Sequence, residues 1–221
     1  MRSLSFMQHG RIEIDSLAAH YSLFLLTGDE SRDDLLSLVE LINTCYRSPS
    51  CWTNESDLIR GDRINLEQVQ EYIKSSEILV LKRDDVVVAD GSSESVSGHS
   101  SGTAPSLVGC VRTGPVTETV VGALEEPAGY VGLLCSHPCS QGKGVGSFLI
   151  EAAEERCASA HGLRKMVMDV LDSREELIRW YEKKGYKRTN KLIPARPFIE
   201  AKGERMLKDC NFILLEKQLS N

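Results

Sequence analysis

The sequence CSQGKGVGSFLIEAAEER, residues 139–156, places three glycines directly ahead of an amphipathic helix. Apolar residues recur at helical spacing from Phe148 to Cys157, and Gly162 is well placed to end the helix. Successive N–H groups at a helix N-terminus form a nest for an anion, and glycines remove the Cβ atoms that would block its approach. The stretch therefore predicts a phosphate-binding loop, with a glycine-rich turn kept only for strand–helix packing as the alternative.

Three kinds of phosphate-binding loop match these glycines to different degrees. A nucleoside-triphosphate loop, GxxxxGK[ST], needs a Lys-Ser or Lys-Thr pair that the stretch lacks. A dinucleotide loop needs GxGxxG directly after a strand, but Ser147 stands at its third glycine position and residues 137–141 separate strand and glycines. The third pattern, Gln/Arg-x-x-Gly-x-Gly/Ala, is met in full by residues 141–146.

The order of the expected elements indicates an α/β fold. Hydrophobic periodicity and capping residues predict helices at 29–47, 65–75, 144–161 and 173–185, the last with a capping box of Ser173 and Glu176. Strands are expected at 77–85, 107–114, 130–138, 165–172, 186–193 and 212–219. We interpret residues 1–221 as one domain, with a flexible Ser/Gly-rich insertion at about 90–106.

The composition excludes several classes of protein. A net charge of −6 argues against nonspecific nucleic-acid binding, which needs a basic face. No stretch is long and apolar enough to span a bilayer, and the first residues lack the apolar core of a signal peptide. The seven cysteines are irregularly spaced without a CxxC pair, so we expect no metal site. A cytoplasmic protein with reduced thiols and no membrane partner is the expectation.

In these motifs and their order the sequence resembles the GNAT superfamily of acetyl-CoA-dependent N-acetyltransferases. The resemblance rests on the two leading helices, the strand LLCSHP (133–138), the glycine loop and the helix WYEKKGY (180–186). It implies a mixed, mostly antiparallel central sheet with helices on both faces. It also implies a fourth strand that bulges and splays from its neighbour, and acetyl-CoA as co-substrate without a metal.

The resemblance further implies roles for one backbone amide and one tyrosine. The N–H of Leu134 is the expected oxyanion donor, since a preorganised amide stabilises developing charge. Tyr181 is expected to protonate the departing thiolate, because a phenol is neutral at working pH and can donate a proton. For Tyr181 the alternative is a purely packing role. The residues expected to contact the coenzyme are Leu134, Cys135, Ser136, Gln141, Gly142, Lys143, Gly144, Val145, Gly146, Ser147, Arg174 and Tyr181.

One of these residues marks a departure from the family pattern. Many members carry Asn-x-x-Ala ahead of the tyrosine helix, whereas this chain has Arg174-Glu-Glu-Leu177. Arg174 is therefore expected either to contact coenzyme phosphates or to be solvated.

The acceptor site is expected around CWTNESDLIRGDR, residues 51–63, because this loop joins the first two helices. Glu55 is the candidate general base, with His137 beside the glycine loop as an alternative. Trp52 can form an apolar or cation–π wall, and Arg63 can hold an anionic group. Ordinary loop roles stay open for all three residues of this loop.

These expectations lead to one main hypothesis and two alternatives. The main hypothesis is transfer of an acetyl group from acetyl-CoA to a primary amine of a small molecule, by direct attack in a ternary complex. The alternatives are acetylation of a peptide or protein amine, and a non-catalytic acyl-CoA-binding module. A homodimer stays open, since edge strands such as 212–219 can pair between subunits.

Overall fold

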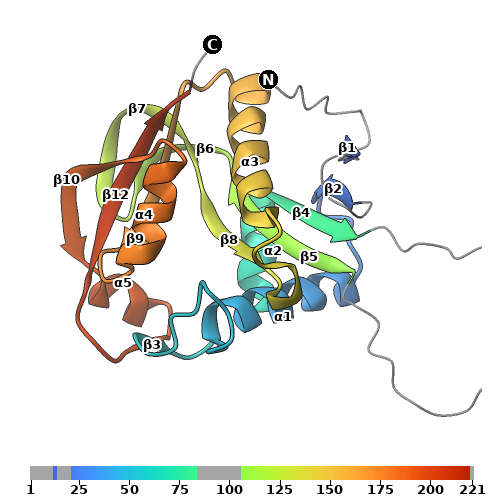
Figure 1. The fold of residues 1–221 in the computed structure, drawn as a ribbon, viewed down its shortest axis with the longest axis horizontal. Helices are drawn as coiled ribbons and strands as arrows, with labels where there is room; N and C mark the ends of the chain where they lie inside the picture. Colours follow the sequence, from blue (N-terminus) through green and yellow to red (C-terminus); the bar gives the residue numbers. More distant parts are fainter. Residues whose placement is uncertain (1–11, 14–20, 84–105, 220–221) are drawn as a thin grey trace, which may run out of the picture.

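In the computed structural model the described residues are 12–13, 21–83 and 106–219, so the expected insertion lies outside them apart from Ser106. Two five-stranded sheets form the body of the fold (Figure 1). The first sheet is antiparallel, in the order β1 (Ile12–Glu13), β2 (Tyr21–Leu25), β4 (Glu77–Arg83), β5 (Leu107–Thr113) and β8 (Gly132–Ser136).

The second sheet is mixed. Its order is β10 (Lys187–Pro194), β12 (Asn211–Gln218), β9 (Lys165–Leu171), β7 (Gly122–Tyr130) and β6 (Pro115–Thr119). All of its pairs are antiparallel except β7 with β9, which is parallel. A small antiparallel pair, β3 (Ile59–Arg60) with β11 (Arg205–Met206), completes the described strands.

Helices cover both faces of the first sheet. Alternate residues of β4 show this directly: Ile78 and Val80 pack in one cluster with α1 (Arg32–Arg47) and α2 (Leu66–Ser75). Leu79 and Leu81 point the other way, into the cluster formed with α3 (Val145–His161) and α4 (Glu175–Lys183). The predicted α/β fold is confirmed.

The strand expected at 130–138 leaves one sheet and enters the other. The N–H of Val131 still donates to Val167 of β9 at 2.9 Å, but from Gly132 onward the chain pairs with β5. Leu133 has a positive φ of 48°, and the register with β5 shifts at this point. Beyond Val131, β8 and β9 belong to different sheets, which confirms the predicted splay.

Several local predictions are confirmed and one is wrong. Asn65 caps α2 in a full capping box, and Gly162 ends α3 with φ +64°. The predicted capping box of Ser173 and Glu176 is wrong: the cap position is Arg174, and the Glu176 carboxylate accepts from Arg174 Nε at 2.9 Å instead.

Some elements were not predicted from the sequence. These are the strands β1 and β2, the hairpin β6–β7 and the short pair β3–β11. Residues 194–211, for which no helix or strand was predicted, contain the helix α5 (Arg196–Ala201) and β11. No helix in the described part of the chain is long and apolar enough to cross a membrane.

Candidate active site

The glycine loop forms one wall of a cavity of about 350 Å³ at the N-terminal end of α3. Gly142 and Gly144 adopt φ values of +73° and +87°, and a Cβ on either would meet no atom within 4 Å. Gly144 caps α3 without any side-chain cap, so the first N–H groups of the helix remain open to a ligand. A left-handed loop with an open concave face fits the pyrophosphate of coenzyme A.

Most residues that the sequence assigned to the coenzyme line this cavity. Lys143 does not line it, and its side chain is exposed. The lining residues are Trp52, Thr53, Leu134, Cys135, Ser136, Ser140, Gln141, Gly142, Gly144, Val145, Gly146, Ser147, Leu177, Trp180 and Tyr181.

Arg174 lies elsewhere. It is only 6% exposed, and its guanidinium donates to the backbone carbonyls of residues 52–54 at 2.7 to 3.2 Å. These bonds, with the contact from Nε to Glu176, engage all three nitrogens of the guanidinium, which are the donors that a phosphate would use. The structure thus places Arg174 as a tie between α4 and the loop after α1, away from the glycine loop.

Gln141 links the glycine loop to two other walls of the cavity. Its Nε2 donates to the carbonyl oxygen of Ser136 at 3.1 Å, while its Oε1 accepts from the N–H of Trp52 at 3.2 Å. The side chain therefore holds the 52–54 loop against the end of β8.

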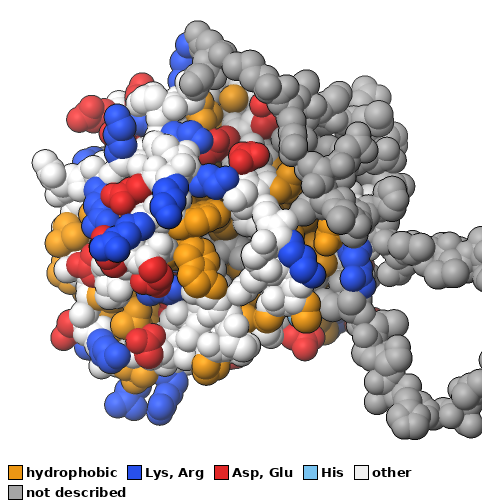
Figure 2. Space-filling model, in the orientation of Figure 1, with side chains coloured by type: hydrophobic (Ala, Val, Ile, Leu, Met, Phe, Trp, Pro, Cys, Tyr) orange, Lys and Arg blue, Asp and Glu red, His pale blue; other side chains and the backbone are white. Residues whose placement is uncertain are grey.

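An aromatic row borders the same cavity. The rings of Trp52 and Trp180 meet edge to face at 5.9 Å, and Trp180 meets Tyr181 at 5.1 Å. Trp52 is 44% exposed and lines only this first cavity. Figure 2 shows apolar side chains gathered on this face between the positions of α4 and α3, among charged side chains of both signs.

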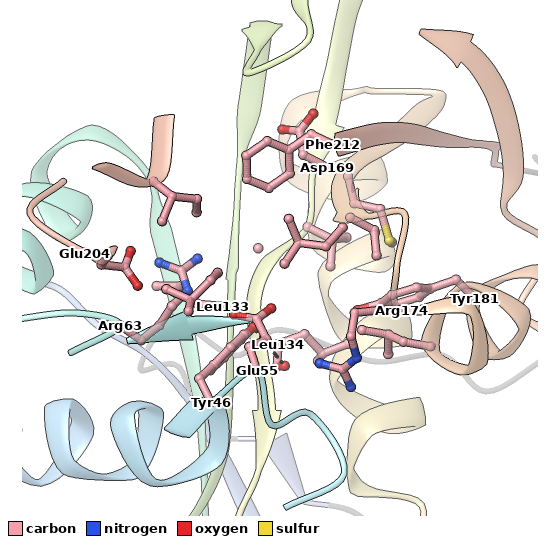
Figure 3. Close-up of a pocket in the computed structure, with 18 of the residues that line it drawn as sticks. Tyr46, Glu55, Arg63, Leu133, Leu134, Asp169, Arg174, Tyr181, Glu204 and Phe212 are labelled. Atoms are coloured by element: carbon pink, nitrogen blue, oxygen red, sulfur yellow. Dashed lines mark hydrogen bonds between the residues drawn. The ribbon is translucent and has the colours of Figure 1, made fainter. Parts of the chain in front are cut away.

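A second cavity, of about 90 Å³, is lined by both of the splayed strands, β8 and β9 (Figure 3). Its apolar walls come from β8, β9, α4 and α5. The polar residues that line it are Tyr46, Glu55, Arg63, Tyr130, Asp169, Arg174, Tyr181, Lys202 and Glu204.

The two cavities share Leu134, Leu177 and Tyr181. Burial raises the pKa of Tyr181 above its ordinary value, and the nearby Glu55 carboxylate raises it further, while Arg174 opposes them. The phenol is therefore protonated at neutral pH, and its hydroxyl has no hydrogen-bond partner among the described residues. A proton donor thus stands where the two cavities meet.

Two carboxylates of the second cavity share one arginine. Arg47 Nη1 lies 3.3 Å from Glu55, and Arg47 Nη2 donates to Glu204. Burial raises the pKa of Glu204, although the charges of Arg63 and Arg47 act against that rise. Arg47, which does not itself line the cavity, therefore fixes the orientation of the Glu55 carboxylate.

Two other groups approach the splayed strand. The hydroxyl of Tyr46 donates to the carbonyl of Leu134 at 3.3 Å. Asp169 accepts from the Tyr130 hydroxyl at 3.3 Å, and burial raises its pKa. His137 lines neither cavity, and its Nδ1 accepts from the N–H of Cys139 at 3.2 Å.

A family model described as the acetyltransferase (GNAT) family matches residues 37–186. The chain belongs to this GNAT family. GNAT enzymes use acetyl-CoA as co-substrate, so the predicted donor is confirmed. Among the residues that the structure describes, no group of three or more His, Cys, Asp or Glu is placed to hold a metal ion.

Solved structures of GNAT proteins resemble this fold over nearly its whole length. A GNAT family acetyltransferase from Elizabethkingia anophelis with acetyl-CoA bound has a TM-score of 0.54 and 17% identity, covering 93% of this chain and 100% of its own. The IAA acetyltransferase from Bacillus cereus has a TM-score of 0.53 and 15% identity, and the match covers 90% of this chain and 99% of that protein. The yncA protein from Salmonella typhimurium, a structure with its cofactor acetyl-CoA, has a TM-score of 0.52 and 14% identity. The match covers 90% of this chain and 95% of that protein. No curated protein matches the chain.

Sequence reasoning missed several residues of this GNAT site. Tyr46 stands at the end of the apolar stripe of α1, and a tyrosine in such a place can turn its hydroxyl toward a site. Lys202 and Glu204 lie between the last two predicted strands, in a segment with no local pattern that marks them. Asp169 gave a signal as a carboxylate within an apolar strand.

Proposed function

We propose that the protein transfers the acetyl group of acetyl-CoA to a primary amine of a small molecule. The observation that carries the proposal is the meeting of two cavities at Leu134, Leu177 and Tyr181. One cavity has the glycine loop for the coenzyme, and the other has charged groups for an acceptor. A ternary complex needs this arrangement, because the amine and the thioester must come within reacting distance.

On the donor side, the glycine loop holds the pyrophosphate and β8 receives the pantetheine arm. β8 is the last strand of its sheet, so the backbone groups on its outer edge are available to an extended ligand. The bound co-substrate supplies an activated acetyl carbon. Trp52 and Trp180 form the aromatic border of this channel.

Three groups of the chain have roles in the reaction. The N–H of Leu134 donates to the thioester oxygen, which gains negative charge as the amine attacks. Glu55 takes the proton that the amine loses, either directly or through a water. As the C–N bond forms and the C–S bond breaks, Tyr181 gives its proton to the sulfur, in keeping with its raised pKa.

The second cavity favours a small acceptor over a peptide. It is about 90 Å³, against about 350 Å³ for the first, and α5 and β11 supply Ile199 and the adjoining Lys202 and Glu204 to its lining. A peptide acceptor needs an open groove along which the chain can leave, and this lining closes one side of the cavity.

Two measurements on the purified protein test the proposal. Acetyl-CoA should raise the melting temperature, and a panel of primary amines should include compounds that release free thiol from acetyl-CoA. No shift would remove the coenzyme assignment. A shift without thiol release from any amine or peptide would favour the non-catalytic module, and release with peptides alone would favour a peptide acceptor.

A further inference from the structure

We infer that the acceptor carries a carboxylate near its primary amine, and that Arg63 binds this carboxylate. The inference rests on the proposed function and deepens it by naming the substrate class, an amino carboxylate. It derives from the charges of the second cavity, and above all from the one arginine there whose guanidinium forms no salt bridge with a carboxylate of the described chain.

The backbone and side chain of Arg63 are both held in place. The Oδ1 of Asn43 accepts from the N–H of Arg63 at 2.7 Å and from the N–H of Ile64 at 3.2 Å. The guanidinium carbon lies 5.2 Å from the centre of the Tyr46 ring, a cation–π distance. Arg63 lines the second cavity, and its guanidinium forms no salt bridge or hydrogen bond with any described residue. Burial acts to lower the pKa of this guanidinium, but Tyr46 and the nearby carboxylates of Glu55 and Glu204 raise it above its ordinary value.

The other arginines at this site are already engaged. Arg47 is shared by the carboxylates of Glu55 and Glu204, and Arg174 is bound to backbone carbonyls and to a further carboxylate. A guanidinium that is fixed but unpaired inside a cavity has donors in a fork that matches a carboxylate. Among the arginines of this site, Arg63 is therefore the one with free capacity for an anion.

The balance of charge favours a zwitterion over a simple amine. Apart from Arg174, which is paired with Glu176, the site has three positive and three negative side chains when all are ionised: Arg47, Arg63 and Lys202 against Glu55, Asp169 and Glu204. A ligand with an ammonium and a carboxylate keeps this balance, whereas a diamine adds uncompensated positive charge beside Arg63.

The positions of the charges agree with such a ligand. In Figure 3, Arg63 lies on one side of the cavity, Tyr181 on the opposite side, and Glu55 between them. A carboxylate at Arg63 would leave the amine near Glu55 and facing Leu134, where the proposed transfer takes place. Recognition and reaction would then use opposite ends of one small molecule.

Matched pairs of amines test the inference. The probes are L-amino acids and short ω-amino acids, each with its methyl ester, which keeps the amine and removes the negative charge. β-Alanine and 2-aminoethylphosphonate form a further pair that compares the two anions. Free thiol released from acetyl-CoA gives kcat/KM, and calorimetry on the CoA complex measures binding of each probe.

We expect the best carboxylate to exceed its ester by about 10- to 100-fold in kcat/KM. Arg63→Met should remove this preference by lowering the carboxylate value, while the ester value stays within about twofold. Arg63→Lys should keep part of the preference for the carboxylate over the ester. If the methionine variant does not fold, the lysine variant is used for the same comparison. Arg60→Met, an exposed cation of the same segment outside both cavities, should keep all of it.

Three results would overturn the inference. They are esters or diamines that equal the carboxylates, a phosphonate that exceeds β-alanine, and an Arg63→Met variant that loses carboxylate and ester activity equally. If acetyl-CoA binds but no amine of any charge releases thiol, the proposed function fails. The calorimetric comparison still decides whether Arg63 selects carboxylates.

Discussion

Tyr181 and Tyr186 lie five positions apart, are both buried, and pack edge to face at 6.1 Å, yet their hydroxyl groups have different surroundings. The Tyr186 hydroxyl donates to Glu154 at 3.0 Å, outside both cavities. The Tyr181 hydroxyl lies where the cavities meet. The pair therefore separates a role in proton transfer from a role in packing.

We predict that Tyr181→Phe lowers kcat by at least about 100-fold while the Kd for acetyl-CoA changes little, because only the proton donor is lost. Tyr186→Phe is the matched control and should keep kcat, since its hydroxyl is bonded to Glu154. Steady-state kinetics and calorimetry measure both quantities. Equal kcat values for Tyr181→Phe and the parent protein would remove Tyr181 from the acid role.

The two kinds of site residue differ in how far the sequence predicts them. The glycine loop depends on a local pattern of six residues, so its place before α3 could be predicted from 141–146 alone. The pairing of Arg47 with Glu204 joins positions 157 apart, and no local pattern contains it. The contacts of Arg174 could not be predicted for a related reason, because its partners are backbone carbonyls, which leave no pattern in a sequence.

At the scale of elements, α4 and the loop after α1 are joined by Arg174. Three backbone carbonyls at residues 52–54 accept hydrogen bonds from its guanidinium, and the loop in turn places Trp52 on the first cavity and Glu55 on the second. Together with Gln141 and Arg47, this side chain positions one wall of each cavity relative to the helix that carries Tyr181.

Arg174→Met should lower the free energy of unfolding by about 1–3 kcal/mol, because three part-buried carbonyls lose their donor. Its kcat should fall and its KM for the acceptor should rise, since displacement of the loop moves the proposed base Glu55 and a wall of the acceptor cavity. Arg179→Met, on the exposed side of the same helix, is the control and should change neither. Chemical unfolding with steady-state kinetics measures the effects; a variant with unchanged stability and KM would contradict the tie.

The elements missed by sequence reasoning share a physical feature. Most residues of β7 are exposed, so it shows little of the apolar pattern that marks a strand, and its pairing with β9 depends on tertiary contacts. β2 carries the apolar run YSLFL, for which no strand was predicted. Helices were predicted better, because caps such as Asn65 and Gly162 are local signals.

At the scale of the whole molecule, an ion cluster joins the first sheet to the far end of α3. Glu77 begins β4, and its carboxylate accepts from Arg156 at 2.8 and 3.0 Å and lies 3.2 Å from His161. Burial acts to raise the pKa of Glu77, but Arg156 and His161 together lower it below its ordinary 4.5. The lowered pKa means that the ionised carboxylate stabilises the fold.

This stabilisation is fully present above pH 4.5 and is lost as the pH falls through the lower pKa of the folded state. We predict that Glu77→Gln lowers the free energy of unfolding by about 1 kcal/mol at pH 7, with the difference shrinking at acidic pH. Glu125→Gln, on the exposed part of β7, is the control. Urea unfolding between pH 3 and pH 7 gives the comparison, and a difference that is constant with pH would contradict the assignment.

The proposed activity requires acetyl-CoA to bind at the glycine loop. The helix α3 carries a matched pair of glycines with which this binding site can be tested. Gly144 and Gly162 stand at opposite ends of the helix, both have positive φ, and a Cβ on either meets no atom within 4 Å. Glutamate at either position brings the same backbone strain and the same charge, but only position 144 borders the cavity.

The most direct measurement is a titration with acetyl-CoA followed by the fluorescence of Trp52 and Trp180, the two tryptophans of the chain, which both line the cavity. We predict saturable binding to the parent protein. Gly144→Glu should weaken it by at least about tenfold, because negative charge then stands at the N-terminus of α3. Gly162→Glu should bind as the parent protein does. No binding to the parent protein, or equal affinity for the two variants, would contradict the account.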